Sequence, residues 1–183
     1  MKARSRRAVL ALLLLASCSG PKDEPVPTPV SYGLFPNLID YRPAYPPGTC
    51  MTEEEMLADQ FIKLRTEIMI TGLSCQASYQ DPDLYTRYVD FTFEHQDRIL
   101  TSQKVLGNLL GRVRRGRDDR LFDTFQTELA NTESQNVTKV STQRYCQARW
   151  EQFNTVLSYD EGEMAAYLQQ AVEHYRDAYT ACN

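Results

Sequence analysis

The sequence has little of the material from which catalytic and metal sites are built. Its two histidines, His95 and His174, lie in neither a His-Glu-x-x-His nor a Glu-x-x-His motif. It has no Gly-rich phosphate-binding loop and no Gly-x-Ser-x-Gly nucleophile motif. No cysteines have Cys-x-x-Cys spacing, so neither a zinc knuckle, a dithiol redox motif nor a c-type haem site is indicated. We therefore expect no catalysis, no cofactor and no metal.

The sequence also lacks an apolar run long enough to span a bilayer. The run from Ala8 to Ala16 has nine residues, whereas a membrane-spanning helix needs ~20. Four cations and no anions precede it, and small residues follow it, which is the pattern of an export signal. Removal of residues 1–17 would leave 166 residues, enough for one domain, and would change the formal net charge from −4 to −8. So acidic a chain is not expected to bind nucleic acid.

The end of this signal, Leu15-Ala16-Ser17-Cys18, resembles the lipobox of bacterial lipoproteins, which are cut just before the cysteine. The resemblance implies a diacylglycerol thioether on Cys18 and acylation of its freed amine by a chain such as palmitate. Because each buried methylene contributes ~0.8 kcal/mol, two or three chains would hold the protein on a membrane. Ser19, in place of Asp, resembles an outer-membrane address on the periplasmic face, with the inner membrane as the alternative. The other reading is a secreted protein in which Cys18 forms a disulfide.

Eight of the nine prolines lie between Pro21 and Pro47, so this region is expected to be extended. Residues 18–30 are polar and are interpreted as a lipid-anchored spacer. Residues 31–49 contain several aromatic and aliphatic residues, and we expect this segment to pack along the folded domain. The alternative is a recognition peptide for a partner.

Helical periodicity begins at Thr52 and continues through most of the remaining chain. Thr52 and Glu55 have the spacing of a capping box, in which each side chain binds the other residue's backbone amide. Apolar residues then recur every three or four positions, which indicates an amphipathic helix. The predicted helices start at Thr52, Asp81-Pro82, Asp118-Asp119, before Cys146, and at Asp160, where Asp160-Glu161-Gly162-Glu163 forms the cap.

The second predicted helix runs to Gly116 and is expected to bend, because it would otherwise be ~50 Å long. Residues 131–141 are polar and ambiguous, and the last stripe continues to Cys182. No segment has the sustained alternation of a strand. The sequence therefore predicts an all-α domain over residues 50–183, a bundle of about five helices behind an extended Pro-rich segment.

Apart from Cys18, four cysteines remain, and in an oxidising compartment they are expected to form two disulfides. Cys50 and Cys75 flank a 22-residue helix of ~33 Å, whereas a disulfide needs Cα atoms within ~7 Å. That pairing is excluded if the helix is straight, and its complement, Cys146 with Cys182, would be out of register. Two connectivities remain open on these grounds.

Residues from Lys63 to Phe153 resemble a family of proteobacterial exported proteins of unassigned function. The resemblance is carried by "LRTEIM" with Leu73 and Cys75, by the stretch from Tyr85, by "ELANTES", and by Tyr145-Cys146. It implies a compact helical domain in which Cys75 and Cys146 are a matched pair. It thus selects the disulfides Cys75–Cys146 and Cys50–Cys182.

The stretch "RVRRGRDDR" is a candidate anion-binding site, because arginine binds phosphate in a bidentate manner and envelope polymers are anionic. Its arginines are Arg112, Arg114, Arg115, Arg117 and Arg120. The alternative is a helix end with ion pairs to Asp118 and Asp119.

The expected function is therefore a structural or adaptor lipoprotein of the cell envelope, held on the membrane through Cys18 and contacting another envelope protein. The alternative is a periplasmic module that binds a small ligand in a bundle cavity. That alternative would place Tyr88, Phe91 and Trp150 around the cavity.

Overall fold

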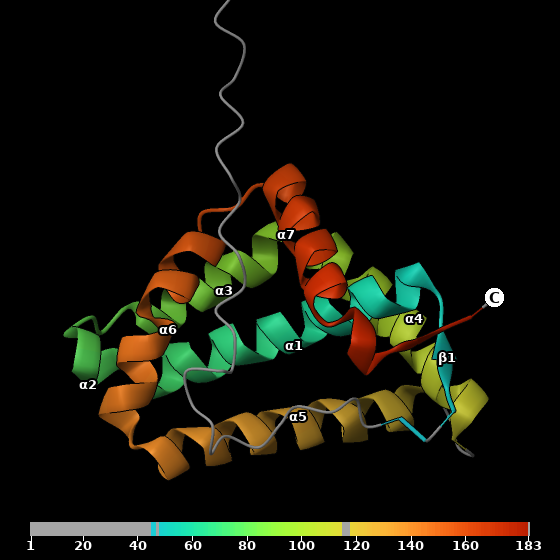
Figure 1. The fold of residues 1–183 in the computed structure, drawn as a ribbon. Helices are drawn as coiled ribbons and strands as arrows, with labels where there is room; N and C mark the ends of the chain where they lie inside the picture. The colour runs from blue at the N-terminus through green and yellow to red at the C-terminus, as the bar shows by residue number, and fades with distance from the viewer. Residues whose placement is uncertain (1–44, 47, 115–117, 183) are drawn as a thin grey trace, which may run out of the picture.

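Seven α-helices form most of the chain that the structure, a computed structural model, describes: residues 45–46, 48–114 and 118–182. The predicted all-α fold is confirmed (Figure 1). The helices are α1 (Glu53–Ser74), α2 (Gln76–Tyr79), α3 (Leu84–Glu94), α4 (Gln96–Val113), α5 (Asp118–Val140), α6 (Thr142–Val156) and α7 (Glu161–His174). A 3-10 turn (Arg176–Ala178) and two short strands, β1 (Cys50–Met51) and β2 (Thr180–Ala181), complete the described elements.

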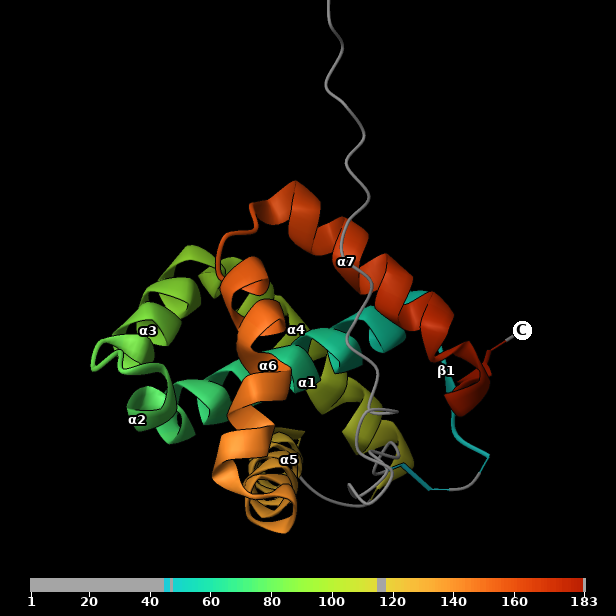
Figure 2. The same cartoon turned by 60° about the vertical axis from the view of Figure 1, so that its left-hand side comes forward.

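Helix α1 lies at the centre, with α5 along one side and α7 across the other (Figures 1 and 2). Its predicted apolar stripe is buried, including Phe61, Leu64 and Ile68. The C-terminal end of α1 closely approaches α3, because a Cβ atom on Gly72 would lie 3.4 Å from the backbone oxygen of Leu84. An alanine Cβ at position 72 would be in van der Waals contact with α3, so a side chain that extends beyond Cβ would have to displace its neighbours.

The capping box predicted at Thr52 is present, and the cap predicted at Asp160 is a second capping box. At the start of α1, Thr52 accepts a hydrogen bond from the Glu55 amide while Glu55 accepts one from the Thr52 amide. At the start of α7, Asp160 and Glu163 form the same reciprocal pair. These caps satisfy amides that would otherwise have no partner inside the helix, so local sequence alone fixes both helix starts.

The long second helix is interrupted, as its expected bend indicated, but it starts later than predicted. It starts at Leu84 instead of Asp81-Pro82, because Asp81 accepts a hydrogen bond from the Asp83 amide within a turn. It is then divided into α3 and α4 at His95, whose backbone leaves helical geometry. The imidazole of His95 is buried between the rings of Phe61 and Phe91, so tertiary packing accompanies this break.

Three further segments differ from the sequence analysis. Residues 131–141, left ambiguous, are helical up to Val140. The short helix α2 and the two strands were not anticipated. The last helix ends at His174 rather than extending to Cys182, and the chain then continues through the 3-10 turn into β2. β2 pairs in parallel with β1, with Cys50 opposite Thr180.

Two disulfides link the described cysteines. Cys50 bonds to Cys182 beside the strand pair, with Cα atoms 4.8 Å apart. Cys75 bonds to Cys146 in the core, with Cα atoms 5.6 Å apart, and joins the end of α1 to α6. These are the partners that the family resemblance selected.

Residues 1–44 lie outside the described part of the chain, and with them the predicted signal, the spacer and most of the aromatic segment. Tyr45, from the end of that segment, stacks on Phe125 with ring centroids 5.8 Å apart and bonds to Asp59. Within residues 45–46, 48–114 and 118–182, no helix combines the length and apolarity needed to cross a membrane.

Candidate functional site

A pocket of about 440 Å³ lies between α1 and α4 and reaches the first turn of α7. Its residues come from these helices and from the last residue of α3. Ala58 and Ser102, one from each wall, are small residues in the buried part of this region. The apolar floor contains Leu57, Phe61 and Val105, and the polar rim contains Glu54, Glu94, Asp97, Arg98, Thr101 and Glu161.

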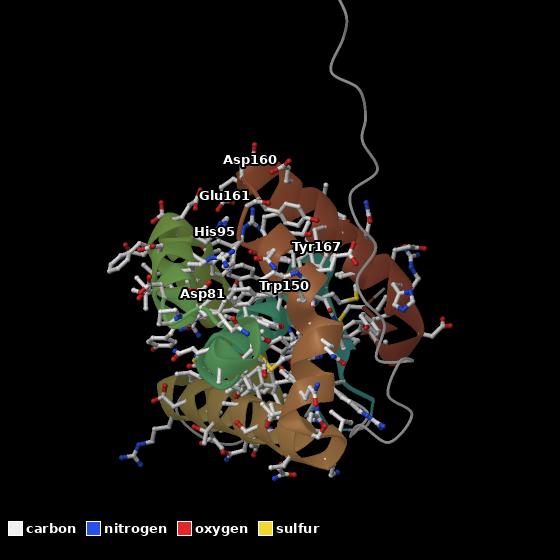
Figure 3. The ribbon with its side chains drawn as sticks, turned by 90° about the vertical axis from the view of Figure 1, so that its left-hand side faces the viewer. Asp81, His95, Trp150, Asp160, Glu161 and Tyr167 are labelled. Carbon is white, nitrogen blue, oxygen red and sulfur yellow. A yellow bond between two sulfur atoms is a disulfide. The ribbon has the colours of Figure 1, made fainter. Side chains whose placement is uncertain are left out.

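Glu161 connects the rim to the helix break. Its two carboxylate oxygens accept hydrogen bonds from different groups: Oε1 lies 2.8 Å from Nδ1 of His95, and Oε2 lies 2.9 Å from Nε of Arg98. Figure 3 shows Glu161 at the start of α7 next to His95. Burial favours the neutral acid, but the hydrogen bonds from Arg98 and His95 outweigh it and hold the pKa of Glu161 below its ordinary value.

Asp90, Glu94 and Asp97 are near His95 in the sequence, but the hydrogen-bond partner of His95 is Glu161, 66 residues further along the chain. The imidazole is only 1% exposed, and its Nε2 has no hydrogen-bond partner among the described residues. His174 is exposed and contacts the ring of Tyr175. The histidines therefore do not converge on one site.

Three rim carboxylates form no ion pair within the described ranges: Glu54, Glu94 and Asp97. All three are exposed, and Arg98 is the only cationic residue lining this pocket. The rim consequently has excess negative charge above an apolar floor. A cation with an apolar body would be attracted to both parts of such a site.

A second polar cluster is buried on the other side of α1. Arg149 of α6 donates to Glu133 of α5 over 3.0 Å and lies 3.5 Å from Glu67 of α1. Gln152 accepts from Arg149 over 2.9 Å, and Tyr145 donates to Glu133. One guanidinium therefore compensates two buried carboxylates and joins three helices in the core.

The buried position changes the acidity of this cluster. Burial raises the pKa of Glu67 to about 7, and the nearby Glu133 carboxylate adds to the rise while Arg149 opposes it. Burial likewise raises the pKa of Tyr145 well above its ordinary value. These side chains form hydrogen bonds to one another inside the core. The cluster therefore has a structural role and does not face a substrate.

The arginine candidates are not gathered into one site by the described residues. Arg112 pairs with Glu55 over 2.9 Å and also donates to the backbone oxygen of Cys50. Arg114 lies 4.0 Å from Glu128, and Arg120 is exposed at the start of α5. Arg115 and Arg117 lie outside the described residues, as do the side chains of Asp118 and Asp119.

The structure does not place Trp150 in the interior with Tyr88 and Phe91, as the alternative ligand-binding reading expected. Tyr88 and Phe91 are buried in the core, whereas the Trp150 side chain is 46% exposed and its ring lies against that of Tyr79. Figure 3 shows Trp150 on α6. The α1–α4 pocket lies elsewhere and shares none of these residues. Sequence reasoning missed it because its lining comes from three separate segments. The one local signal was the density of carboxylates around Asp97.

Cys18, the predicted lipidation site, lies outside the described residues. In the described part of the chain, no group of three or more His, Cys, Asp or Glu residues has an arrangement that could hold a metal ion. Comparison with protein families, with curated proteins and with solved structures finds no match for this chain.

Proposed function

We propose that this chain is an exported, lipid-anchored protein whose helical domain has a structural or adaptor role in a bacterial cell envelope. The observation that carries the proposal is the pairing of the cysteines. Cys50 bonds to Cys182 and Cys75 bonds to Cys146, so none of these four is left to pair with Cys18. Cys18 is thereby left for the lipid that its lipobox-like context predicts.

The two disulfides also support export. Disulfides persist in oxidising compartments such as the periplasm and are rare in the cytosol. One of them closes the domain beside its two short strands and the other joins α1 to α6. A domain cross-linked in this way fits the compartment to which the basic and apolar residues before Cys18 would direct it.

The adaptor role is supported by large apolar side chains on the surface. Phe93 is 72% exposed, Leu100 is 54% exposed and Leu73 is 52% exposed. Scattered exposed apolar residues are ordinary, but Phe93 and Leu100 flank two rim residues of the pocket, Glu94 and Asp97, in the sequence. This combination favours contact with another envelope component.

The proposed address is the outer membrane, with the domain on the periplasmic face, because Ser19 follows the cysteine. The test uses the full chain and its Cys18→Ser variant expressed in a Gram-negative bacterium and labelled with an alkyne analogue of palmitate. We expect the label on the wild type only, and we expect the variant to leave the membrane fraction. Sucrose-gradient fractionation then separates outer from inner membrane.

Ser19→Asp is the matched control for sorting, since it leaves Cys18 intact and should retain the label while moving the protein to the inner membrane. An unmodified N-terminal Cys18 on the mature wild-type protein, detected by mass spectrometry, would refute the lipid anchor. If the wild-type protein is found in the inner-membrane fraction, the proposed outer-membrane location is wrong, but the lipid anchor is not refuted.

A further inference from the structure

The α1–α4 pocket combines an apolar floor with a rim of carboxylates at the surface of the domain. We infer that it is a docking site for a cationic amphipathic segment of a partner protein, in which a lysine or arginine side chain enters the pocket. The inference rests on the proposed adaptor role and names the chemistry of the partner.

The floor gives an incoming side chain an apolar surface. Leu57 and Val105 are partly buried, and Phe61 lies beneath them in the core. The volume of about 440 Å³ falls within the ~300–1,000 Å³ typical of binding pockets. The methylene stem of a lysine or arginine can cover such a floor while its charged end stays at the rim.

The carboxylates of the rim favour a partner side chain with a positive charge. Glu54 in α1 and Glu94 and Asp97 at the junction of α3 and α4 line the pocket and have no ion pair within the described ranges. The fourth rim carboxylate, Glu161, is shared by Arg98 and His95. An incoming cation would therefore meet carboxylates that the chain itself leaves uncompensated, whereas an anion would be repelled.

One cation of the chain is already bound at this pocket by an apolar ring and a carboxylate. The guanidinium of Arg98 lies 5.8 Å from the centroid of the Phe61 ring and bonds to Glu161. A cation held over an aromatic face and against a carboxylate is a favourable arrangement. A partner's cation above Leu57, paired with Glu54 or Asp97, would repeat the contact of that arrangement with a carboxylate.

The surroundings indicate a segment longer than one side chain. Phe93 precedes the rim residue Glu94, and Leu100 precedes the rim residue Thr101. Both apolar side chains are more than half exposed. A partner helix with apolar residues and cations at spacings of three or four would cover them while placing a cation in the pocket.

The test measures binding of a labelled amphipathic lysine–leucine peptide to the full, oxidised chain by fluorescence anisotropy. We expect Glu94→Gln/Asp97→Asn to weaken binding at least ten-fold. Thr101→Trp should weaken it similarly, because an indole at this exposed rim position would fill the entrance without changing the charge. Asp123→Asn/Glu151→Gln removes the same charge from exposed positions on α5 and α6 and should change the Kd less than two-fold. Circular dichroism checks that each variant is folded.

Four results would overturn the inference. Equal weakening by the α5/α6 control would mean attraction by net charge alone. A lysine–glutamine peptide of equal charge that binds as tightly would mean that the apolar floor is unused. Tight binding of hexylamine would indicate a small-molecule site, and a dimer dissociated by Thr101→Trp in ultracentrifugation would indicate a second copy. Loss of the membrane anchor in the Cys18→Ser test leaves this binding measurement unaffected, so the two failures are distinguishable.

Discussion

Tyr45 and Tyr179 donate hydrogen bonds to opposite oxygens of one buried carboxylate, that of Asp59 in α1. Tyr45 precedes β1 and Tyr179 precedes β2, so both ends of the helical domain are fastened to the same point of the central helix. Lys63 also bonds to Asp59, one turn further along α1. Burial raises the pKa of Tyr45 well above its ordinary value, and the charge of Asp59 adds to the effect.

This shared acceptor predicts the effect of removing one hydroxyl. Tyr179→Phe keeps the ring and removes a donor to a charged acceptor, so the free energy of unfolding should fall by ~1–3 kcal/mol. Urea denaturation measures the change. Tyr85→Phe, at an exposed position on α3, should stay within about 0.5 kcal/mol of wild type. If Tyr179→Phe is as stable as wild type, the bonds of this hydroxyl to Asp59 and Gln60 make no net contribution to stability.

The second prediction concerns the guanidinium that joins α1, α5 and α6. Arg149→Met leaves Glu67 and Glu133 buried without their cation, and should lower the free energy of unfolding by ~3–5 kcal/mol. Arg176→Met breaks an exposed pair with Glu173 and should cost at most ~1 kcal/mol. Equal effects of the two substitutions in thermal and urea unfolding would contradict a structural role for the buried cluster.

Glu67 gives the protein a predictable pH dependence. Its pKa of about 7 in the folded state exceeds the ordinary value of 4.5, so the folded protein binds this proton more tightly than the unfolded chain. The contribution to stability is complete below about pH 4.5 and is lost as the pH rises through about 7. Glu67→Gln should abolish this pH-dependent loss. Between pH 4.5 and pH 7, the free energy of unfolding of the variant should therefore rise by up to ~3 kcal/mol relative to that of the wild type.

Urea midpoints at pH 5 and pH 8 measure this difference. Glu151→Gln, at an exposed position of α6, is the control and should leave the pH profile unchanged. A difference between wild type and Glu67→Gln that is the same at both pH values would show that Glu67 does not titrate in this range.

The fourth prediction separates the two disulfides. Cys75 and Cys146 are fully buried, whereas Cys50 and Cys182 are partly exposed, so dithiothreitol should open the Cys50–Cys182 bond first. Alkylation followed by peptide mapping identifies the opened pair. Because Cys50 and Cys182 are 132 residues apart, Cys50→Ser/Cys182→Ser should lower the free energy of unfolding by ~4–5 kcal/mol in the chain-entropy account. If the Cys75–Cys146 bond is reduced first, burial does not control the access of dithiothreitol to these disulfides.

Local features of the fold could be predicted from the sequence because their causes are local. The cap at Thr52 and the cap at Asp160 each depend on a residue three positions away. The break at His95 has no proline or glycine, and it coincides with a contact to Glu161, which is 66 residues further along the chain. Periodicity along one helix does not report such a contact.

The polar stretch 131–141 was ambiguous for a different reason. Glu133 and Asn136 are fully buried there, and Glu133 accepts hydrogen bonds from both Arg149 and Asn136. Pattern reading assigns polar residues to the surface, so a buried polar cluster is hidden from it. The pocket was likewise hidden, because its rim assembles carboxylates from three segments of the chain.

The strand pair and its disulfide also determine how the domain carries load. β1 and β2 run parallel, and a covalent bond joins Cys50 to Cys182 beside them. A pulling force applied between these two positions passes through the sulfur–sulfur bond and bypasses the helices between them. A tether attached before Cys50 could therefore be stretched against an attachment after Cys182 without unwinding α1 to α7, and the core would remain at rest while the linkage is under tension.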